Sequence, residues 1–175
     1  MRAFLAVDVP LEIREKLSSI SGEMENKCIK AVPLDNMHIT LAFLGEISEK
    51  QGEGIVEKLG DRGIRKEKVV VKGLGVFPSV DYVRVVWAGA YGLDSIENSV
   101  RSSLQELNMV REESRKWHGH ITIARVKCKA DVKSYLEKYN GVEFGTFNVN
   151  AITLYKSVLA KPHAIYEKIA DIKLG

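Results

Sequence analysis

The stretch HITLAFLGEI, from His38 to Ile47, is similar to a second stretch, HITIARVK, from His120 to Lys127, and both begin with His-Ile-Thr. Both stretches are rich in β-branched and apolar residues, which predicts a β-strand in each. Because successive side chains of a strand point to opposite faces, the histidine and the threonine of each motif share one face. Each predicted strand therefore presents an imidazole and a hydroxyl, His38 with Thr40 and His120 with Thr122, on an otherwise apolar ribbon.

Chance does not readily account for the repetition of this motif. The chain contains four histidines and four threonines, and half of each fall in these two motifs. If the residues were shuffled, two such motifs would arise in roughly a few sequences per thousand. The pattern therefore predicts that the four side chains act together in one site.

The segments around the two motifs also repeat, in the order strand, helix, strand, helix, strand. The same interval separates Phe4 from His38 and Val86 from His120. We therefore expect two similar lobes that face one another, each contributing one histidine–threonine strand. The predicted divisions are repeat halves of about residues 1–78 and 79–160, a boundary at Pro78-Ser79 and a closing strand over residues 164–174.

Helix starts are predicted from apolar spacing and from capping signals. Ile13, Leu17, Ile20 and Met24 recur at helical spacing after Pro10, so a helix is expected there. The patterns Ser48-x-x-Gln51 and Asp94-x-x-Glu97 match the capping box that opens many helices. The runs Arg62 to Lys68 and Arg111 to Lys116 mix both charge signs, which is typical of solvated connectors.

Composition predicts one globular domain in the cytoplasm, and we expect a monomer. The chain has 175 residues, 45% of them hydrophobic and 28% charged, and a net charge of +3 that permits an anionic partner without requiring one. No apolar run is long enough for a membrane span, so no membrane partner is expected. Asp8 and Pro10 interrupt the apolar N-terminal segment, which is predicted to be a strand and not a signal peptide.

The two cysteines carry no recognisable motif. Cys28 and Cys128 lie far apart in the sequence and belong to no Cys-x-x-Cys pattern. We therefore expect two reduced thiols and neither a disulfide framework nor a zinc ribbon. His118-Gly119-His120 has the spacing of two metal ligands, but no recognisable set of further ligands accompanies it, so no metal or other cofactor is predicted.

Two histidines and two threonines suit chemistry on a phosphodiester. Since the unperturbed pKa of histidine is near 6.5, one imidazole can be neutral and accept a proton from water while the other is protonated and donates to the leaving oxygen. Each role typically contributes about 10²–10⁴ in rate. The hydroxyls can donate hydrogen bonds to the non-bridging oxygens, and this scheme needs no metal ion.

Beyond these motifs, the chain resembles a known family almost from end to end. It resembles the two-histidine (2H) phosphoesterases, and within them the LigT-like RNA 2′,3′-cyclic phosphodiesterases, which are also called 2′-5′ RNA ligases. The similar segments are RAFLAVDVP, DNMHITLAFLGE, GVFPSVDYVRVVWAG, HGHITIARV and ITLYKSVLAKPHAIYEKI. The segment Lys161-Pro162-His163 departs from the family, because a glycine-containing turn is expected there.

The resemblance implies an α+β fold of two pseudo-symmetric lobes, each an antiparallel sheet with helices on its outer face, flanking a central cleft. It also implies hydrolysis of a terminal RNA 2′,3′-cyclic phosphate to a 2′-phosphate. His38 would be the general acid and His120 the general base, with Thr40 and Thr122 binding phosphate. Arg125 matches a phosphate-binding arginine of the family, although strict strand alternation would turn it to the opposite face unless the strand bulges, twists or ends.

Several alternatives remain open at this level. The same residues would serve a 2′-5′ RNA ligase that joins tRNA halves, a non-catalytic RNA-binding module, or an enzyme acting on a small nucleotide. The expected partner is RNA with a 2′,3′-cyclic phosphate end, tRNA fragments included. Candidate RNA contacts are aromatic or basic, with Trp87 expected in the core: Phe77, Tyr82, Trp87, Trp117, Arg84, Lys127, Lys156 and Lys161.

Overall fold

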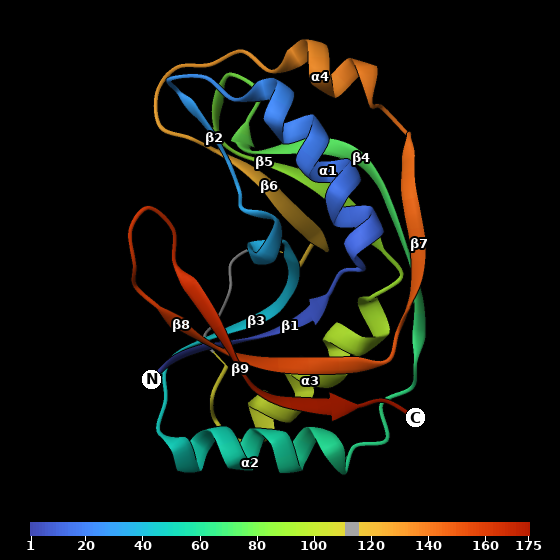
Figure 1. Ribbon diagram of the computed structural model, residues 1–175. Coiled ribbons are helices and arrows are strands. Elements are labelled where there is room, and N and C mark those ends of the chain that lie inside the picture. Colours follow the sequence, from blue (N-terminus) through green and yellow to red (C-terminus); the bar gives the residue numbers. More distant parts are fainter. Residues whose placement is uncertain (111–115) are drawn as a thin grey trace.

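The computed structural model describes residues 1–110 and 116–175 (Figure 1). Most of the mixed-charge run from Arg111 to Lys116 lies outside the described residues. The helices are α1 (Leu11–Met24), the short 3₁₀ helix η1 (Leu34–Asn36), α2 (Glu49–Gly60), α3 (Asp94–Glu106) and α4 (Lys133–Lys138). The strands are β1 (Arg2–Asp8), β2 (Ile29–Ala31), β3 (His38–Glu46), β4 (Glu67–Ser79), β5 (Tyr82–Tyr91), β6 (His120–Val126), β7 (Glu143–Val149), β8 (Ala151–Val158) and β9 (Ile165–Lys173).

The strands form one antiparallel sheet that divides into two lobes. Its order is β7-β4-β5-β6-β3-β1-β8-β9, and β2 pairs with β6 outside this path. Strands β3 and β6 meet at a single residue pair, Ile39 with Ile121, and this junction separates a first lobe (β3, β1, β8, β9) from a second lobe (β6, β5, β4, β7, β2). The expected α+β fold of two sheet lobes is confirmed.

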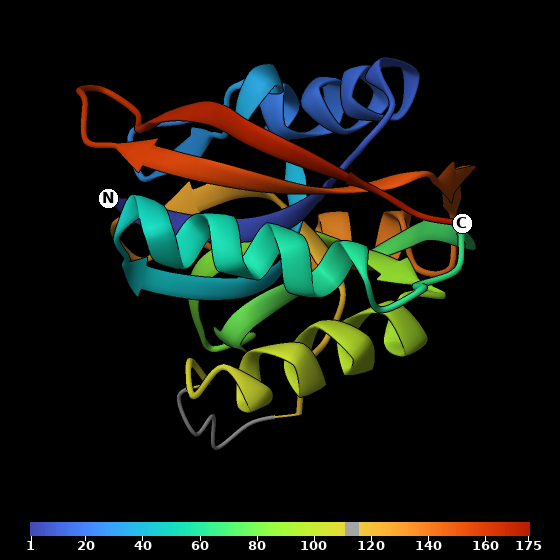
Figure 2. The ribbon, with the colours of Figure 1, turned by 90° about the horizontal axis from the view of Figure 1, so that it is seen from below.

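Helices cover each lobe on one side. In Figure 1, α1 and α4 lie at the top over the second lobe, and α2 and α3 lie at the bottom under the first lobe. Figure 2, seen from below, shows α2 and α3 side by side. The buried residues of α1 include Ile13, Leu17, Ile20 and Met24, which is the spacing that predicted the helix. No helix in the described ranges is long and apolar enough to span a bilayer.

Each lobe is built from both parts of the chain. Strand β4 precedes residue 80 in sequence but pairs with β5 and β7 in the second lobe, whereas β8 comes late and pairs with β1 in the first lobe. Pro78 and Ser79 lie in β4 and pair with Val83 and Tyr82 of β5, so this point is a hairpin within one sheet. The sequence repeat therefore does not correspond to one lobe per half.

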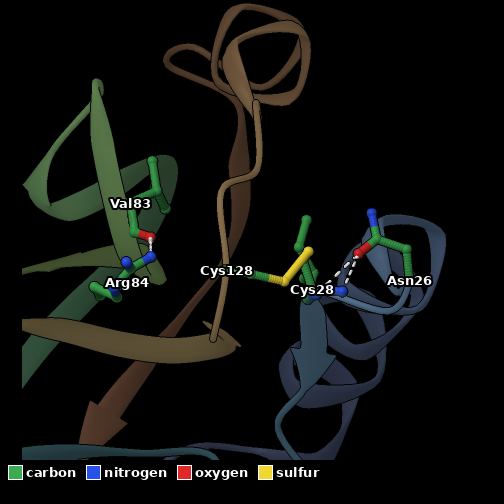
Figure 3. The surroundings of a disulfide bond; sticks show 6 residues. Asn26, Cys28, Val83, Arg84 and Cys128 are labelled. Atoms are coloured by element: carbon green, nitrogen blue, oxygen red, sulfur yellow. Dashed lines mark hydrogen bonds between the residues drawn. A yellow bond between two sulfur atoms is a disulfide. The ribbon is translucent and has the colours of Figure 1, made fainter.

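The two cysteines form a disulfide, so the prediction of two reduced thiols was wrong (Figure 3). Their Cα atoms lie 5.0 Å apart although 100 residues separate them in sequence. The antiparallel pairing of β2 with β6 brings them together, because Cys28 precedes β2 and Cys128 follows β6. The N–H of Lys127 donates to the carbonyl of Cys28 at 2.9 Å, which extends this pairing to the cysteines.

Candidate active site

The two histidine–threonine motifs meet where the lobes join. Ile39 and Ile121 face each other in the β3–β6 pair, and both are fully buried. Their neighbours point to the opposite face, where all four polar side chains are half-buried. Continuing the antiparallel register by one residue in each direction sets each histidine opposite the threonine of the other motif. We call these residues the His/Thr quartet: His38, Thr40, His120 and Thr122.

Backbone carbonyls fix the orientation of both imidazoles. The Nδ1 atom of His38 lies 2.7 Å from the carbonyl oxygen of Asn36, and Nδ1 of His120 lies 2.8 Å from that of His118. Since a carbonyl oxygen only accepts hydrogen bonds, each Nδ1 carries a proton and Nε2 is the atom left for chemistry. The hydroxyl of Thr40 donates to Nε2 of neutral His38 at 2.9 Å.

Aromatic rings hold each imidazole from the side in a similar way. The ring of Tyr166 meets His38 at 5.2 Å with an interplanar angle of 87°, and Phe77 meets His120 at 5.1 Å with an angle of 85°. Phe4 also lies 5.0 Å from His38. The two edge-on contacts and the tilted Phe4 ring restrict rotation of the imidazoles and shield them partly from water.

Burial lowers the pKa of both histidines from the ordinary value. For His38, the Asn36 carbonyl and the Asp8 carboxylate oppose this effect, whereas the positive charges of His120 and Arg125 lower its pKa further. For His120, its hydrogen bond to His118 opposes the effect of burial, and the imidazole of His118 adds a small lowering influence. The positive charges of His120 and Arg125 thus act on His38 in the same direction as burial.

A β-bulge in β6 turns Arg125 to the face of the quartet. Thr122 pairs with Trp87 and Ala124 pairs with Val86, so Ile123 is an extra residue without a partner in β5. Ile123 and Ala124 are therefore buried in succession, and Arg125 emerges exposed on the side of His120. Without the bulge, strict alternation would turn Arg125 to the opposite face of the sheet; with the bulge, it lies on the same face as His120 and Thr122.

Phe43 occupies the corresponding position in β3 and was not anticipated from the sequence. Register shifts between β1 and β3 carry its ring to the quartet's face, where it is 74% exposed and lies 6.3 Å from the ring of Phe4. Phe43 follows Thr40 by the interval at which Arg125 follows Thr122. That shared position in the two motifs was the signal that could have revealed it.

Trp87 lines the site, although it was expected in the core. Its half-buried ring contacts His118 at 4.8 Å and Phe77 at 5.2 Å. The ring lies directly over Gly75, where a Cβ atom would approach it to 2.2 Å. The Nε1 atom of Trp87 is buried, and no described residue accepts its hydrogen bond.

The other aromatic and basic candidates for RNA contacts lie on several different elements of the fold. Trp117 donates from Nε1 to the carbonyl of Thr40 at 3.2 Å and so ties the segment before β6 to β3. The guanidinium of Arg84 covers the exposed ring of Tyr82 at 4.0 Å, near the tip of the β4–β5 hairpin. Lys127 follows β6, Lys156 lies in β8, and Lys161 lies in the β8–β9 loop.

A hollow of about 290 Å³ adjoins His38 on the side of the first lobe. Asp8 lies at its wall, directly opposite His38 in the β1–β3 register. The carboxylate of Asp8 accepts a hydrogen bond from the Tyr155 hydroxyl and lies 3.5 Å from Nζ of Lys168. Burial and the charge of Asp8 raise the pKa of Tyr155, so its phenol stays protonated as a donor. Among the described residues, no group of three or more potential metal ligands gathers.

Comparison with known proteins shows the family of the chain. The family model of LigT like Phosphoesterases matches residues 7–87 and 91–166. The chain belongs to the LigT-like phosphoesterase family. It is 38% identical to the RNA 2′,3′-cyclic phosphodiesterase of Methanocaldococcus jannaschii, over 98% of this chain and 99% of that protein. It is 37% identical to the enzyme of the same name from Archaeoglobus fulgidus, over 97% of this chain and 98% of that protein.

Two solved structures share the whole fold. A protein of Thermus thermophilus superposes with a TM-score of 0.85 at 25% identity, covering 99% of this chain and 98% of its own. Escherichia coli LigT, solved in complex with 3′-AMP, superposes with a TM-score of 0.82 at 27% identity, covering 99% of this chain and 97% of its own.

Proposed function

We propose that this protein hydrolyses the 2′,3′-cyclic phosphate at the end of an RNA to a 2′-phosphate. The observation that carries the proposal is the pair of imidazoles on one face, each anchored through Nδ1 to a backbone carbonyl, so that Nε2 of each is the atom left for chemistry; Nε2 of His38 contacts the Thr40 hydroxyl. Its relatives named RNA 2′,3′-cyclic phosphodiesterase supply the substrate class. Action as a monomer in the cytoplasm, on RNA fragments that include tRNA halves, is part of the same proposal.

The quartet can perform this reaction with water as the only co-reactant. Nε2 of neutral His120 accepts a proton from water as the water oxygen bonds to phosphorus, and the bond from phosphorus to O3′ breaks. Protonated His38 gives its proton to O3′, so the products are a 3′-hydroxyl and a 2′-phosphate. Thr40, Thr122 and Arg125 donate hydrogen bonds to the non-bridging oxygens, where negative charge accumulates in the transition state.

The neighbourhood of each histidine supports this division of roles. Burial lowers the pKa of His38, but Asp8 lies opposite it and its charge opposes that lowering, which favours the protonated form that a general acid needs. For His120 no carboxylate of the described residues contributes, and the hydrogen bond to the His118 carbonyl offsets the lowering of the pKa by burial only in part, which leaves the neutral form that a general base needs favoured. Asp8→Asn should therefore shift the alkaline limb of the kcat/KM profile to lower pH and leave the acidic limb in place. An unchanged alkaline limb would contradict the role given to Asp8.

A substrate with a good leaving group separates the acid from the base. A p-nitrophenyl phosphodiester needs no proton on its leaving oxygen, so His38→Ala should lose far less activity on it than on a cyclic phosphate. His120→Ala should be impaired on both substrates, because water must still be activated. Rescue of His120→Ala by this substrate, with none for His38→Ala, would reverse the assignment.

The direct test uses a short RNA ending in a 2′,3′-cyclic phosphate, with a chelator present. The parent should form a 2′-phosphate, and His38→Ala and His120→Ala should each lose at least about 10²-fold in kcat. His163→Ala is the matched control, because His163 is exposed in the β8–β9 loop and lies outside the quartet. Near-parental turnover by either folded quartet variant would refute the mechanism.

The quartet also suits a joining reaction that differs from hydrolysis only in its nucleophile. If an RNA 5′-hydroxyl rather than water attacked the cyclic phosphate, with the same acid and base, a 2′-5′ linkage would form. We therefore keep 2′-5′ RNA joining as a second candidate function. Incubation of the cyclic-phosphate RNA with a second RNA bearing a 5′-hydroxyl would reveal a longer product only if joining occurs.

A further inference from the structure

A second cation lies beside Arg125 and takes no part in the mechanism above. Lys30 of β2 pairs directly with Arg125 of β6 in the antiparallel register. Directly opposed residues of such a pair extend from the same face, and Arg125 is on the face of the His/Thr quartet. Lys30 and Arg125 are both exposed, whereas the next opposed pair, Ile29 and Val126, is buried. Lys30 therefore lies one strand beyond Arg125 on the face of the His/Thr quartet.

Among the described residues, no carboxylate neutralises the positive charges of Lys30 and Arg125. Like charges directly opposite one another destabilise a β-sheet. Within the described ranges, no carboxylate lies within ion-pair distance of Lys30 or Arg125, although other lysines and arginines are paired in this way. An anion between or beside the two side chains would remove this repulsion, so the pair has the character of a binding site for a negatively charged group.

The local structure holds β2, and with it Lys30, firmly in place. The disulfide from Cys28 to Cys128 closes the pairing of β2 with β6 just before Lys30. The side-chain oxygen of Asn26 accepts hydrogen bonds from the N–H groups of Cys28 and Ile29 at 2.8 and 2.9 Å, as Figure 3 shows. A three-residue edge strand is thus fixed at its start by a covalent bond and a side-chain cap.

We propose that Lys30, together with Arg125, forms a second phosphate subsite that binds the phosphodiester on the 5′ side of the terminal nucleotide. The inference rests on the proposed function, because it places the cyclic phosphate in the quartet. The next phosphate along the RNA is attached to O5′ of the same ribose, and Lys30 is the cation directly opposite Arg125 in the β2–β6 pair. The subsite makes an RNA chain a better substrate than a nucleoside cyclic phosphate, which has no second phosphate.

The test compares two substrates that differ in this one group. A nucleoside 2′,3′-cyclic phosphate lacks the 5′ phosphodiester, and a dinucleotide ending in the same cyclic phosphate has it. Lys30→Ala should lower kcat/KM for the dinucleotide about tenfold, mainly through KM, as expected for the loss of one charge-assisted hydrogen bond to a phosphate. Its kcat/KM for the nucleoside substrate should stay unchanged, and Lys30→Arg should restore most of the loss.

Lys27→Ala is the matched control, because Lys27 is an exposed lysine of the same segment that lies outside β2. Salt provides a second readout: removing one phosphate contact should reduce the slope of log affinity against log salt by about 0.7 for single-stranded RNA. Binding of the dinucleotide product, which ends in a 2′-phosphate, is measured by titration as well, because it does not depend on turnover.

The outcomes separate this inference from the proposed function. If the parent cleaves both substrates and Lys30→Ala binds and cleaves the dinucleotide as the parent does, the subsite is refuted while the function stands. If the parent cleaves neither substrate, the proposed function fails, and the titration alone decides the subsite. Equal losses for Lys27→Ala and Lys30→Ala would also refute it, because general surface charge would then explain the effect.

Discussion

Removing the disulfide between Cys28 and Cys128 should lower the stability of the folded chain substantially. The bond closes a loop across 100 residues of sequence. On the chain-entropy model, a loop of about 100 residues contributes about 4.7 kcal/mol by restricting the unfolded state, whereas measured contributions are typically about 2–4 kcal/mol. Because the bond links two paired strands without displacing their register, we expect a value in the measured range for this protein.

The measurement is urea denaturation of the parent, with and without a reductant, beside the double variant Cys28→Ser/Cys128→Ser. A loss of about 2–4 kcal/mol corresponds to a fall in Tm of roughly 4–16 °C for a chain of this size. The double variant serves as its own control, since reductant should leave its denaturation midpoint unchanged. Thiol titration of the folded parent should detect no free thiol.

Two results would refute this reasoning. Two reactive thiols in the protein purified without reductant would mean that the disulfide does not form in solution. A bonded protein that loses less than about 1 kcal/mol on reduction would mean that β2 and β6 are held together mainly by other contacts, because the typical disulfide contribution is larger.

Three further predictions concern the site and its support. Gly75→Ala should displace the ring of Trp87, shift tryptophan fluorescence and cost about 1–3 kcal/mol in urea denaturation; an unshifted spectrum would contradict the close approach. Ile121→Ala should cost about 2–5 kcal/mol, against about 0.5–1.5 kcal/mol for Ile121→Val, because Ile121 is fully buried at the junction. Since burial lowers the pKa of His38 and His120, the base stays neutral at lower pH and the acid loses its proton at lower pH. Both limbs of the kcat/KM profile should therefore fall below about pH 6.5, and an optimum above about pH 7.5 would contradict this.

Local patterns in the sequence were enough to predict the strands of the quartet and the helix starts that depend on neighbouring residues. Ser48 and Gln51 form the expected capping box, with both reciprocal hydrogen bonds present. The similar pattern at Asp94 did not cap α3 as expected, because the helix begins at Asp94 itself with Leu93 as its N-cap. Glu97 pairs instead with Arg101 one turn later, an interaction that competes with a capping role.

The features that could not be predicted from the sequence depend on contacts between segments that lie far apart in the chain. The disulfide required knowledge that β2 pairs with β6, and nothing in the spacing of Cys28 and Cys128 reveals that pairing. Trp87 lies in an apolar strand, so its place over Gly75 became visible only from the β4–β5 register. The exposure of Phe43 depends on irregularities in the β1–β3 pairing, which alternation in one strand cannot predict.

Strand β4 comes from the first half of the chain but lies in the second lobe, and β8 comes from the second half but lies in the first lobe. This crossing limits how the two lobes can move relative to each other. A cut in the β4–β5 turn would leave each fragment with pieces of both lobes, so neither fragment could complete a sheet without the other. The lobes are therefore interlocked and cannot behave as two bodies on a flexible linker. The two histidines flank the Ile39–Ile121 pair that joins the interlocked lobes, so we expect RNA to bind a preassembled site and the chemical step to proceed without domain closure.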